Sequence, residues 1–358
     1  MTLFFLAVYG LMTLVLAANL LLLWRRGRTR APFDGRVSVL IPARNEEANL
    51  TRLLPSLLAQ QGINFEVIVY DDASEDGSAA VARAHADDRL RLLEGGGPPA
   101  GWVGKVHALH QAARQATGDV LFFLDADTVF KDDWALERIV ARRAALPPHS
   151  ILTGLPHFRG GAPLLVSLLP YGLLVNQPLL LTERLRSRLT SMNGQCWLID
   201  RADYAAHEPH RAHPNEVLED IRIGQYLSRR GVLPHYADLT DDLEVWMYRD
   251  TAEGWRGFRK NAYLLAGGHP ASFAVFWGVF VLTFVVAPLR SPIWLLWAMG
   301  TKFVSDRIAR YPLWVTLLTP VSYVLWTLLL LDSFVSHRRG RVVWKGRPVA
   351  LTRRPADA

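Results

Sequence analysis

Paired carboxylates directly after an apolar run are the clearest chemical signal in the sequence. Asp125 and Asp127 flank Ala126 and follow the apolar residues 120–124. A pair at this spacing, in an extended segment, can aim oxygen ligands at one divalent cation and leave positions open for phosphate oxygens. The motif lacks histidine and cysteine, the ligands that zinc favours. It therefore predicts Mg²⁺ or Mn²⁺ as the metal.

Two more apolar runs end in polar residues. Residues 37–41 lead into Pro42, Arg44, Asn45 and Glu46, and residues 65–70 lead into Asp71 and Asp72. A single acid at such a position is as often a helix cap or part of a turn as a functional group. Three such ends at one place would favour a binding site instead.

The segments between these ends predict the scaffold that positions them. Strand-like runs at 37–41, 65–70, 90–93 and 120–124 alternate with helical patterns at 49–58, 78–86 and 106–116. This alternation predicts an α/β fold with a mainly parallel sheet. Ligands bind at the carboxyl ends of the strands in such sheets. We therefore expect the three polar ends along one edge, beside a glycine-rich loop at 95–101.

Two common nucleotide-binding motifs are excluded. Gly104-Lys105 is similar to the end of a phosphate-binding P-loop, but Pro99 stands at the position of its first glycine. Val106 also replaces the required serine or threonine. No G-x-G-x-x-G follows a predicted strand, which argues against a dinucleotide-binding fold.

Basic residues are concentrated in two short segments of a chain with 40 Lys and Arg and 33 Asp and Glu. The two clusters are Arg25, Arg26, Arg28 and Arg30, and Arg338, Arg339, Arg341, Lys345, Arg347, Arg353 and Arg354. Without these eleven cations and Asp357, 29 cations face 32 acids. The body of the protein is slightly acidic, so we expect no nucleic-acid partner.

Long uncharged segments adjoin both clusters and predict a multi-pass protein of the cell membrane. Residues 1–24 can cross a bilayer as an N-terminal helix. The arginines that follow place the next domain in the cytoplasm. A cleaved signal peptide is the alternative, although its basic residues would precede the apolar core. The single cysteine, Cys196, allows no intrachain disulfide and agrees with a cytoplasmic location.

The C-terminal region contains further apolar segments. Residues 270–289 and 311–331 are long enough to span a bilayer, whereas 291–301 are apolar but short. The short segment is part of a span, a re-entrant hairpin or an interfacial segment, and its role decides on which side the tail ends. The sequence predicts an N-terminal anchor at 1–24, one globular domain at 36–269, a membrane region at 270–335 and a basic tail at 336–358.

Five motifs in this order resemble family 2 glycosyltransferases with the GT-A fold. They are Val39-Leu40-Ile41-Pro42-Ala43-Arg44-Asn45-Glu46, Asp71-Asp72-Ala73-Ser74-Glu75-Asp76-Gly77, Gly101-Trp102-Val103-Gly104-Lys105, Leu124-Asp125-Ala126-Asp127-Thr128 and Glu219-Asp220. The later Gly257-Phe258-Arg259-Lys260-Asn261 and Trp344-Lys345-Gly346-Arg347 are similar to the membrane-bound branch that glycosylates carotenoids and related isoprenoid lipids. The resemblance covers nearly the whole chain.

The resemblance implies a role for each matching residue. Pro42, Arg44, Asn45, Glu46 and Asp72 would line the nucleotide pocket, with Asp71 beside it. Lys105 would help to hold the donor, and Asp125 and Asp127 would hold the diphosphate through the metal. Asp220 would be the general base of an inverting transfer. Without the resemblance, the start of a helix is the better interpretation of Glu219-Asp220.

Two places depart from the pattern of this branch. Glu208-Pro209-His210 stands where the branch often has Gly-Gly-His, which puts the acceptor-side loop in doubt. Trp246 stands where an arginine commonly precedes Met-Tyr, and Arg249, Arg256 or Arg259 could substitute for that cation.

Two other groups of residues allow more than one interpretation. The loop that contains His207, His210 and His213 favours solvated or locally bonded histidines over a metal site. The leucine-rich residues 164–189 predict either core helices or an interfacial segment that admits a lipid acceptor.

Together these features predict an inverting, metal-dependent glycosyltransferase of the cell membrane. The expected donor is a nucleotide-sugar, UDP-glucose, and the expected acceptor is a hydroxyl or carboxyl of an isoprenoid lipid such as a carotenoid. The alternatives are another lipid acceptor (a hopanoid, a sphingolipid-like molecule or a polyprenyl phosphate) and a non-catalytic membrane scaffold with the same fold. A processive polysaccharide synthase is disfavoured because its Gln-x-x-Arg-Trp signature is missing, and a transporter would leave the acidic strand ends unexplained.

Overall fold

The computed structural model describes residues 1–184, 190–344, 347 and 348, and these form two compact units. The first, called the sheet unit here, comprises Leu21–His157 and Leu179–Trp246. The second, the helical unit, comprises Met1–Leu20, Phe158–Pro178 and the described residues from Met247 onward. Arg186, Arg188, Lys345 and the basic tail beyond residue 348 lie outside the described residues.

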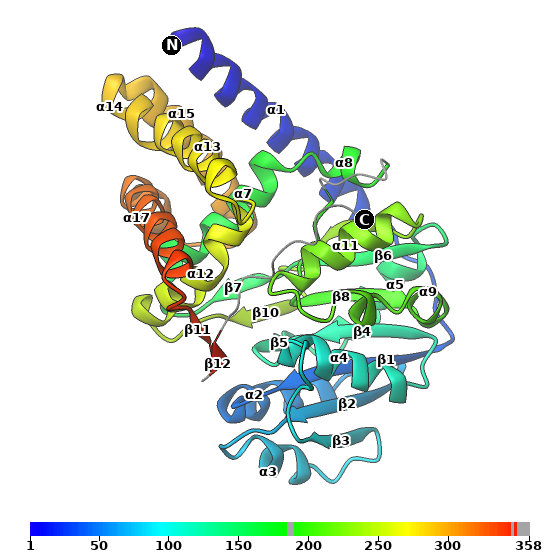
Figure 1. Cartoon of the computed structure of the whole chain (residues 1–358). Helices are drawn as coiled ribbons and strands as arrows, with labels where there is room; N and C mark the ends of the chain where they lie inside the picture. The colour runs from blue at the N-terminus through cyan, green and yellow to red at the C-terminus, as the bar shows by residue number, and fades with distance from the viewer. Residues whose placement is uncertain (185–189, 345–346, 349–358) are drawn as a thin grey trace. The chain divides into compact units, whose positions relative to one another are not determined.

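The sheet unit is built on a seven-stranded sheet in the order β3-β2-β1-β4-β8-β6-β9 (Figure 1). The strands are β1 (Arg36–Ala43), β2 (Asn64–Asp72), β3 (Leu90–Gly95), β4 (Val120–Leu124), β6 (Ser150–Leu155), β8 (Cys196–Asp200) and β9 (Leu233–Asp238). β1 pairs in parallel with β2 and β4, and β3 adds in parallel to β2. Only β8 runs antiparallel to its neighbours. The expected mainly parallel α/β sheet is thus confirmed.

Helices lie between these strands along the chain, and several of them begin shortly after the polar residues at a strand end. They are α2 (Glu47–Leu58), α3 (Ser78–Arg83), α4 (Gly104–Gln115), α5 (Ala135–Ala144), α8 (Leu179–Thr182), α9 (Arg201–His207), α10 (Pro209–Ala212) and α11 (Glu219–Arg229). A small antiparallel pair is formed by β5 (Thr128–Phe130) and β10 (Leu243–Trp246). β7 (His157–Arg159) crosses the division between the units.

Several element ends differ from those expected from the sequence. β1 runs through Pro42 to Ala43, although the sequence predicts that Pro42 ends the strand. Pairing with β4 ends at Leu40, so Pro42 stands where β1 keeps only β2 as a partner and the missing proline N–H is tolerated. α4 begins at Gly104, two residues before the expected start, which places Lys105 in its first turn.

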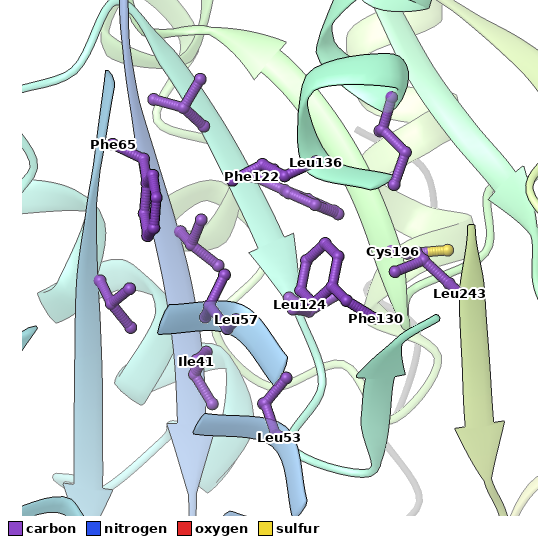
Figure 2. Close-up of a cluster of buried hydrophobic side chains, with 14 of the residues drawn as sticks. Ile41, Leu53, Leu57, Phe65, Phe122, Leu124, Phe130, Leu136, Cys196 and Leu243 are labelled. Atoms are coloured by element: carbon purple, nitrogen blue, oxygen red, sulfur yellow. The ribbon is translucent and has the colours of Figure 1, made fainter. Parts of the chain in front are cut away.

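Apolar side chains cover both faces of the sheet, which explains why the strands read as continuous apolar runs. Figure 2 shows the layer on one face, where Ile41, Phe65, Phe122 and Leu124 pack beside Leu53 and Leu57 of α2. Alternate residues of the same strands belong to the other layer: Leu40, Ile68, Leu121 and Phe123, beside Ala108 and Leu109 of α4. The two layers fix the strand register, because a shift by one residue would exchange the faces.

The helical unit contains most of the long apolar helices. Its elements are α6 (Pro163–Val166), α7 (Leu168–Asn176), α12 (Thr251–Leu265), α13 (Pro270–Val281), a π-helical segment (Leu282–Val286), α14 (Ala287–Arg290), α15 (Pro292–Ile308), α16 (Leu313–Leu317) and α17 (Thr319–Arg338), followed by the short pair β11 (Val343–Trp344) and β12 (Arg347–Pro348). The N-terminal helix α1 (Thr2–Arg26) begins in this unit and ends in the sheet unit.

Three helices of the described chain are long and apolar enough to cross a membrane: Thr2–Arg26, Pro270–Arg290 and Thr319–Arg338. The third starts eight residues later than position 311, where the sequence placed its start, because Pro312 and Pro320 begin separate helices, α16 and α17. The short segment at 291–301 becomes the first part of α15, whose Lys302 and Asp306 form a fully buried ion pair. Thr316 also donates a hydrogen bond of 2.7 Å to Asp306.

The first part of the leucine-rich segment packs within the helical unit. The indole N–H of Trp326 donates to the carbonyl of Leu165 at 2.9 Å, and the amide of Asn19 donates to the carbonyl of Leu174 at 2.9 Å. Residues 158–178 therefore group with the apolar helices. The compact units do not follow the domain bounds of the sequence prediction, which places this segment in the globular domain at 36–269.

The two-layer core makes a direct prediction about stability. Phe122 is fully buried at the centre of one layer, so Phe122→Ala should cost about 3–5 kcal/mol and lower the Tm by roughly 10 °C. Trp134→Ala is the control, because this aromatic side chain is 51% exposed. Thermal unfolding of both purified variants measures the difference, and equal losses would contradict the core assignment.

Candidate active site

The ends of β1 and β2 are tied together by the side chains that follow them. In the pairing register Ala43 lies opposite Asp71. The Arg44 guanidinium donates to the carbonyls of Asp72 (2.8 Å) and Ala73 (2.6 Å). Asn45 accepts a hydrogen bond of 2.8 Å from the backbone N–H of Glu75. Arg44 and Asn45 thus hold the shape of this edge, whatever ligand it binds.

This edge carries local backbone strain. Asn45 has a φ of 53° and Ala73 a φ of 56°, a left-handed conformation that is unfavourable for alanine. Such strain persists only where the surrounding structure enforces it, and it is common at binding sites. Here it turns the chain sharply after β1 and after β2.

The remaining predicted nucleotide residues also lie at this edge. Asp71 accepts hydrogen bonds from the backbone N–H of Ser74 (3.1 Å) and from the Ser74 hydroxyl. The side chain of Asp72 is buried, and that of Glu46 accepts a hydrogen bond from Asn49 at 2.6 Å. Asp71 is thus a turn-forming residue in this structure. The structure brings the predicted residues together, while their roles toward a nucleotide stay predictions.

The paired carboxylates lie in a turn between β4 and β5. The backbone N–H of Thr128 donates to the carbonyl of Asp125 at 3.2 Å, and Ala126 is buried between the two acids. The backbone N–H of Trp246 in β10 donates to the carbonyl of Asp127 at 2.8 Å. The prediction of an extended segment here is wrong, because residues 125–127 form a turn that leads into β5. Both carboxylates are nonetheless half-buried at the carboxyl end of β4.

Lys105 joins this turn to the start of α11. Its ammonium lies 2.8 Å from a carboxylate oxygen of Asp125 and 3.0 Å from one of Glu219. Burial by itself would lower the pKa of Lys105, but the two carboxylates raise it, so the side chain stays charged. Burial also raises the pKa of Asp125, which Lys105 opposes. The family resemblance implies that Lys105 helps to hold the donor, whereas its pairing with both acids is not apparent from the sequence.

Asp220 occupies the first turn of α11, where the positive end of the helix favours an anion. One carboxylate oxygen accepts from the backbone N–H of Gly194 at 3.0 Å, the other from that of Ile221 at 2.8 Å. Burial, and then the negative charge of Glu219, raise the pKa of Asp220 to about 6, against the effects of Lys105 and the two N–H groups. A carboxyl group with this pKa can accept a proton near neutral pH.

A short loop before β8, which was not predicted from the sequence, links these groups. Gly194 donates to Asp220, and its carbonyl lies 3.4 Å from the Lys105 ammonium. The carbonyl of Gln195 accepts from the backbone N–H of Asp125 at 2.9 Å. A Cβ atom at Gly194 would lie 2.8 Å from the Cβ of Asp220, so only glycine fits here. The Asn193-Gly194 dipeptide, a common turn signal, could have pointed to this loop.

Asp125 and Asp127 carry the kind of oxygen ligand that suits a hard divalent cation, which also binds phosphate oxygens and water. Mg²⁺ is usually held by one or two carboxylates together with substrate phosphates, and Mn²⁺ accepts the same oxygen ligands. Within the described ranges there is no group of three or more His, Cys, Asp or Glu side chains that could hold a metal by themselves. Any such ion at Asp125 and Asp127 would therefore take its remaining ligands from water or from the phosphate oxygens of a bound donor.

The sequence departures have local structural explanations. His210 is buried against Phe123 and Trp197, its ring nitrogen lies 2.8 Å from the Tyr204 hydroxyl, and burial lowers its pKa to about 3. These contacts are those of a locally bonded histidine.

At the second departure, the Arg52 guanidinium lies 5.1 Å from the centre of the Trp246 ring, so a cation is present beside the tryptophan that stands in place of arginine.

A polar cavity of about 410 Å³ lies beside α4. Trp102, from the predicted Gly101–Lys105 motif, lines it and stacks on His110, with 5.3 Å between ring centres. Arg114 and Arg211 supply positive charge, and Glu208 of the departing loop also lines it. The cavity was not foreseen from the sequence, because its walls come from segments about 100 residues apart.

Residues 38–202 match the family model described as Glycosyl transferase family 2. The chain is 24% identical, over 96% of its length and 97% of the relative, to a 4,4'-diaponeurosporenoate glycosyltransferase of Staphylococcus aureus (strain USA300). A relative of the same name from Staphylococcus haemolyticus is 28% identical over 54% of this chain and 52% of its own. A mannosyltransferase from Pyrobaculum calidifontis, solved in complex with GDP-Man and Mn²⁺, matches 93% of this chain and 98% of its own, with 19% identity and a TM-score of 0.53.

The pairing of Lys105 with Asp125 predicts strong energetic coupling. A double-mutant cycle with Lys105→Met and Asp125→Asn should give a coupling energy of about 1–2 kcal/mol in thermal or denaturant unfolding, because both groups are mostly buried. The exposed Arg83–Glu94 pair is the matched control and should give a smaller value. Additive effects of Lys105→Met and Asp125→Asn would contradict the pairing.

Proposed function

Since residues 38–202 match the model of glycosyltransferase family 2, we propose that this chain is an inverting, metal-dependent enzyme that glycosylates a membrane lipid. The proposed donor is UDP-glucose, and the proposed acceptor is a hydroxyl or carboxyl of an isoprenoid lipid such as a carotenoid. The observation that carries the proposal is the buried group of Lys105, Asp125, Glu219 and Asp220, with its proton-accepting carboxyl.

Asp220 is the proposed general base. The acceptor oxygen attacks the anomeric carbon of the sugar, and the bond from that carbon to the phosphate oxygen breaks. The nucleoside diphosphate leaves with the electron pair of that bond, while the acceptor proton passes to the Asp220 carboxylate. A single displacement of this kind inverts the anomeric configuration. The backbone N–H groups of Gly194 and Ile221 donate to the Asp220 carboxylate and hold it in one orientation for this proton transfer.

Asp125 and Asp127 are the proposed metal ligands, and the metal would stabilise the charge of the departing diphosphate. Lys105 keeps Asp125 and Glu219 close together at neutral pH, because it offsets the repulsion between two carboxylates. Pro42, Arg44, Asn45, Glu46, Asp71 and Asp72 are the proposed nucleotide-side residues. The position of these residues at the carboxyl ends of β1 and β2 supports this role.

The membrane assignment supports a lipid acceptor. Three helices of the described chain could span a bilayer, and the relatives from Staphylococcus are named 4,4'-diaponeurosporenoate glycosyltransferases. We propose that the sheet unit faces the cytoplasm, because four arginines lie at and just after the end of α1. A carboxyl acceptor in an apolar environment would stay protonated, so a hydroxyl and a carboxyl both present a proton to Asp220.

Two alternatives are disfavoured by particular contacts. A scaffold without catalysis gives no reason to bury Asp220 beside a second carboxylate, which costs stability. A transporter would need polar groups along a path, but Lys302 and Asp306 form an ion pair that is fully buried.

Mass spectrometry of lipid and pigment extracts tests the proposed function. Carotenoid-producing cells expressing the wild type should contain a hexosylated carotenoid, and cells expressing Asp220→Asn should not. Protein levels in the membrane fraction, measured by immunoblot, control for folding. If neither extract contains the product while the purified wild type still transfers sugar to another lipid, the carotenoid assignment is wrong and the reaction class stands.

The pKa of Asp220 predicts the pH dependence of turnover. The base must be deprotonated, so kcat/KM of the purified wild type should fall as the pH drops below about 6, and by roughly tenfold at pH 5. Steady-state rates measured between pH 5 and 8 with UDP-glucose, and in parallel with GDP-mannose, provide this profile and compare the donors.

Glu219→Gln serves as the matched variant for the pH profile. Glu219 raises the pKa of Asp220 by its negative charge, so its removal should move the acidic limb to lower pH while activity at pH 8 persists. Asp220→Asn should lose activity over the whole range. An unchanged limb in Glu219→Gln would contradict the assignment of that limb to Asp220.

A further inference from the structure

A cationic cavity lies at the end of α1, and none of the proposed catalytic residues lines it. Its volume is about 260 Å³, and its polar lining consists of Arg25, Arg26, Thr29 and Arg142. No acidic side chain lines it in the part of the chain that the structure describes. Three arginines around one small cavity repel one another to the extent that nearby acids do not balance their charges.

The three arginines differ in how far their charge is balanced. Arg26 binds both carboxylate oxygens of Glu183, one of them at 2.6 Å. Arg142 is only 7% exposed and pairs with Asp242. Its Nε–H has no hydrogen-bond partner among the described residues. Arg25 is exposed and forms no ion pair with a described residue. Arg25 therefore contributes a free charge, and Arg142 contributes a buried donor that lacks an acceptor.

The rest of the lining is apolar and adjoins a helix that could span a membrane. Leu22 and Leu146 form part of the wall, and Leu22 lies in α1, which is long and apolar enough to cross a membrane. Trp24 is 55% exposed, and the Arg28 guanidinium lies 3.9 Å from the centre of its ring. Exposed tryptophan and arginine at the end of a membrane helix mark the level of the lipid headgroups.

We propose that this cavity binds the phosphate of an anionic lipid headgroup. The arginines supply the charge-assisted donors that a phosphate accepts, and the leucines suit the glycerol and the first acyl carbons. A free phosphate ion offers the same charge to the arginines but has no apolar part for Leu22 and Leu146. The site would hold the end of α1 at the membrane surface, and it does not depend on the proposed sugar transfer.

Lipid binding to the purified full chain tests the proposal without an activity assay. The protein in neutral detergent is titrated with phosphatidylglycerol or with phosphatidylcholine of the same acyl chains, and retained lipid is measured by native mass spectrometry. The wild type should retain one phosphatidylglycerol in preference to phosphatidylcholine. Arg25→Gln should weaken this retention about fivefold, because one cation near the headgroup is lost.

Arg30→Gln is the matched control, since it removes an equal charge from the same exposed segment outside the cavity. It should stay within twofold of the wild type. A separate titration with inorganic phosphate distinguishes the sources: phosphate that binds with the same dependence on Arg25, and displaces the lipid, would identify free phosphate as the ligand and overturn the lipid assignment. Equal losses in both variants, or none in either, would overturn the site itself.

Discussion

The ion pairs of Lys105 are the constraint on which the candidate active site depends. Its ammonium lies within 3.0 Å of Asp125 at the end of β4 and of Glu219 at the start of α11. Without this charge, two mostly buried carboxylates would repel each other across a region of low dielectric. Lys105 thereby connects an element on the sheet edge with the helix that carries Asp220, a separation of about 100 residues along the chain.

Two other features make this arrangement possible. β1 pairs in parallel with β2 and with β4, so the carboxyl ends of the three strands lie along one edge of the sheet. The polar segments that follow the strands therefore begin close together. Glycine at position 194 lets the loop before β8 approach Asp220 closely enough to donate its N–H. Burial, together with the negative charge of Glu219, raises the pKa of Asp220 into the range where it can accept a proton.

The parallel sheet and its polar edge could be predicted from the sequence, because apolar runs and the acids after them follow local rules. The pairing of Lys105 with Glu219 could not, since it joins segments that no local pattern connects. The turn at Asp125–Asp127 was also missed, because β5 depends on pairing with the distant β10. Residues 311–331 are continuously apolar, but Pro312 and Pro320 divide them between two helices. The last long helix therefore starts at Thr319 and not at residue 311.

The binding of UDP to the purified protein, measured by isothermal titration calorimetry with and without Mn²⁺, tests the central claim most directly. The wild type should bind UDP at least about tenfold more tightly with Mn²⁺, because the cation would join the diphosphate to the carboxylates. Asp127→Asn should lose this enhancement, and Asp133→Asn, an exposed acid six residues further on, should keep it. UDP affinity that depends on neither Mn²⁺ nor Asp127 would contradict a metal ion that joins the diphosphate to Asp127.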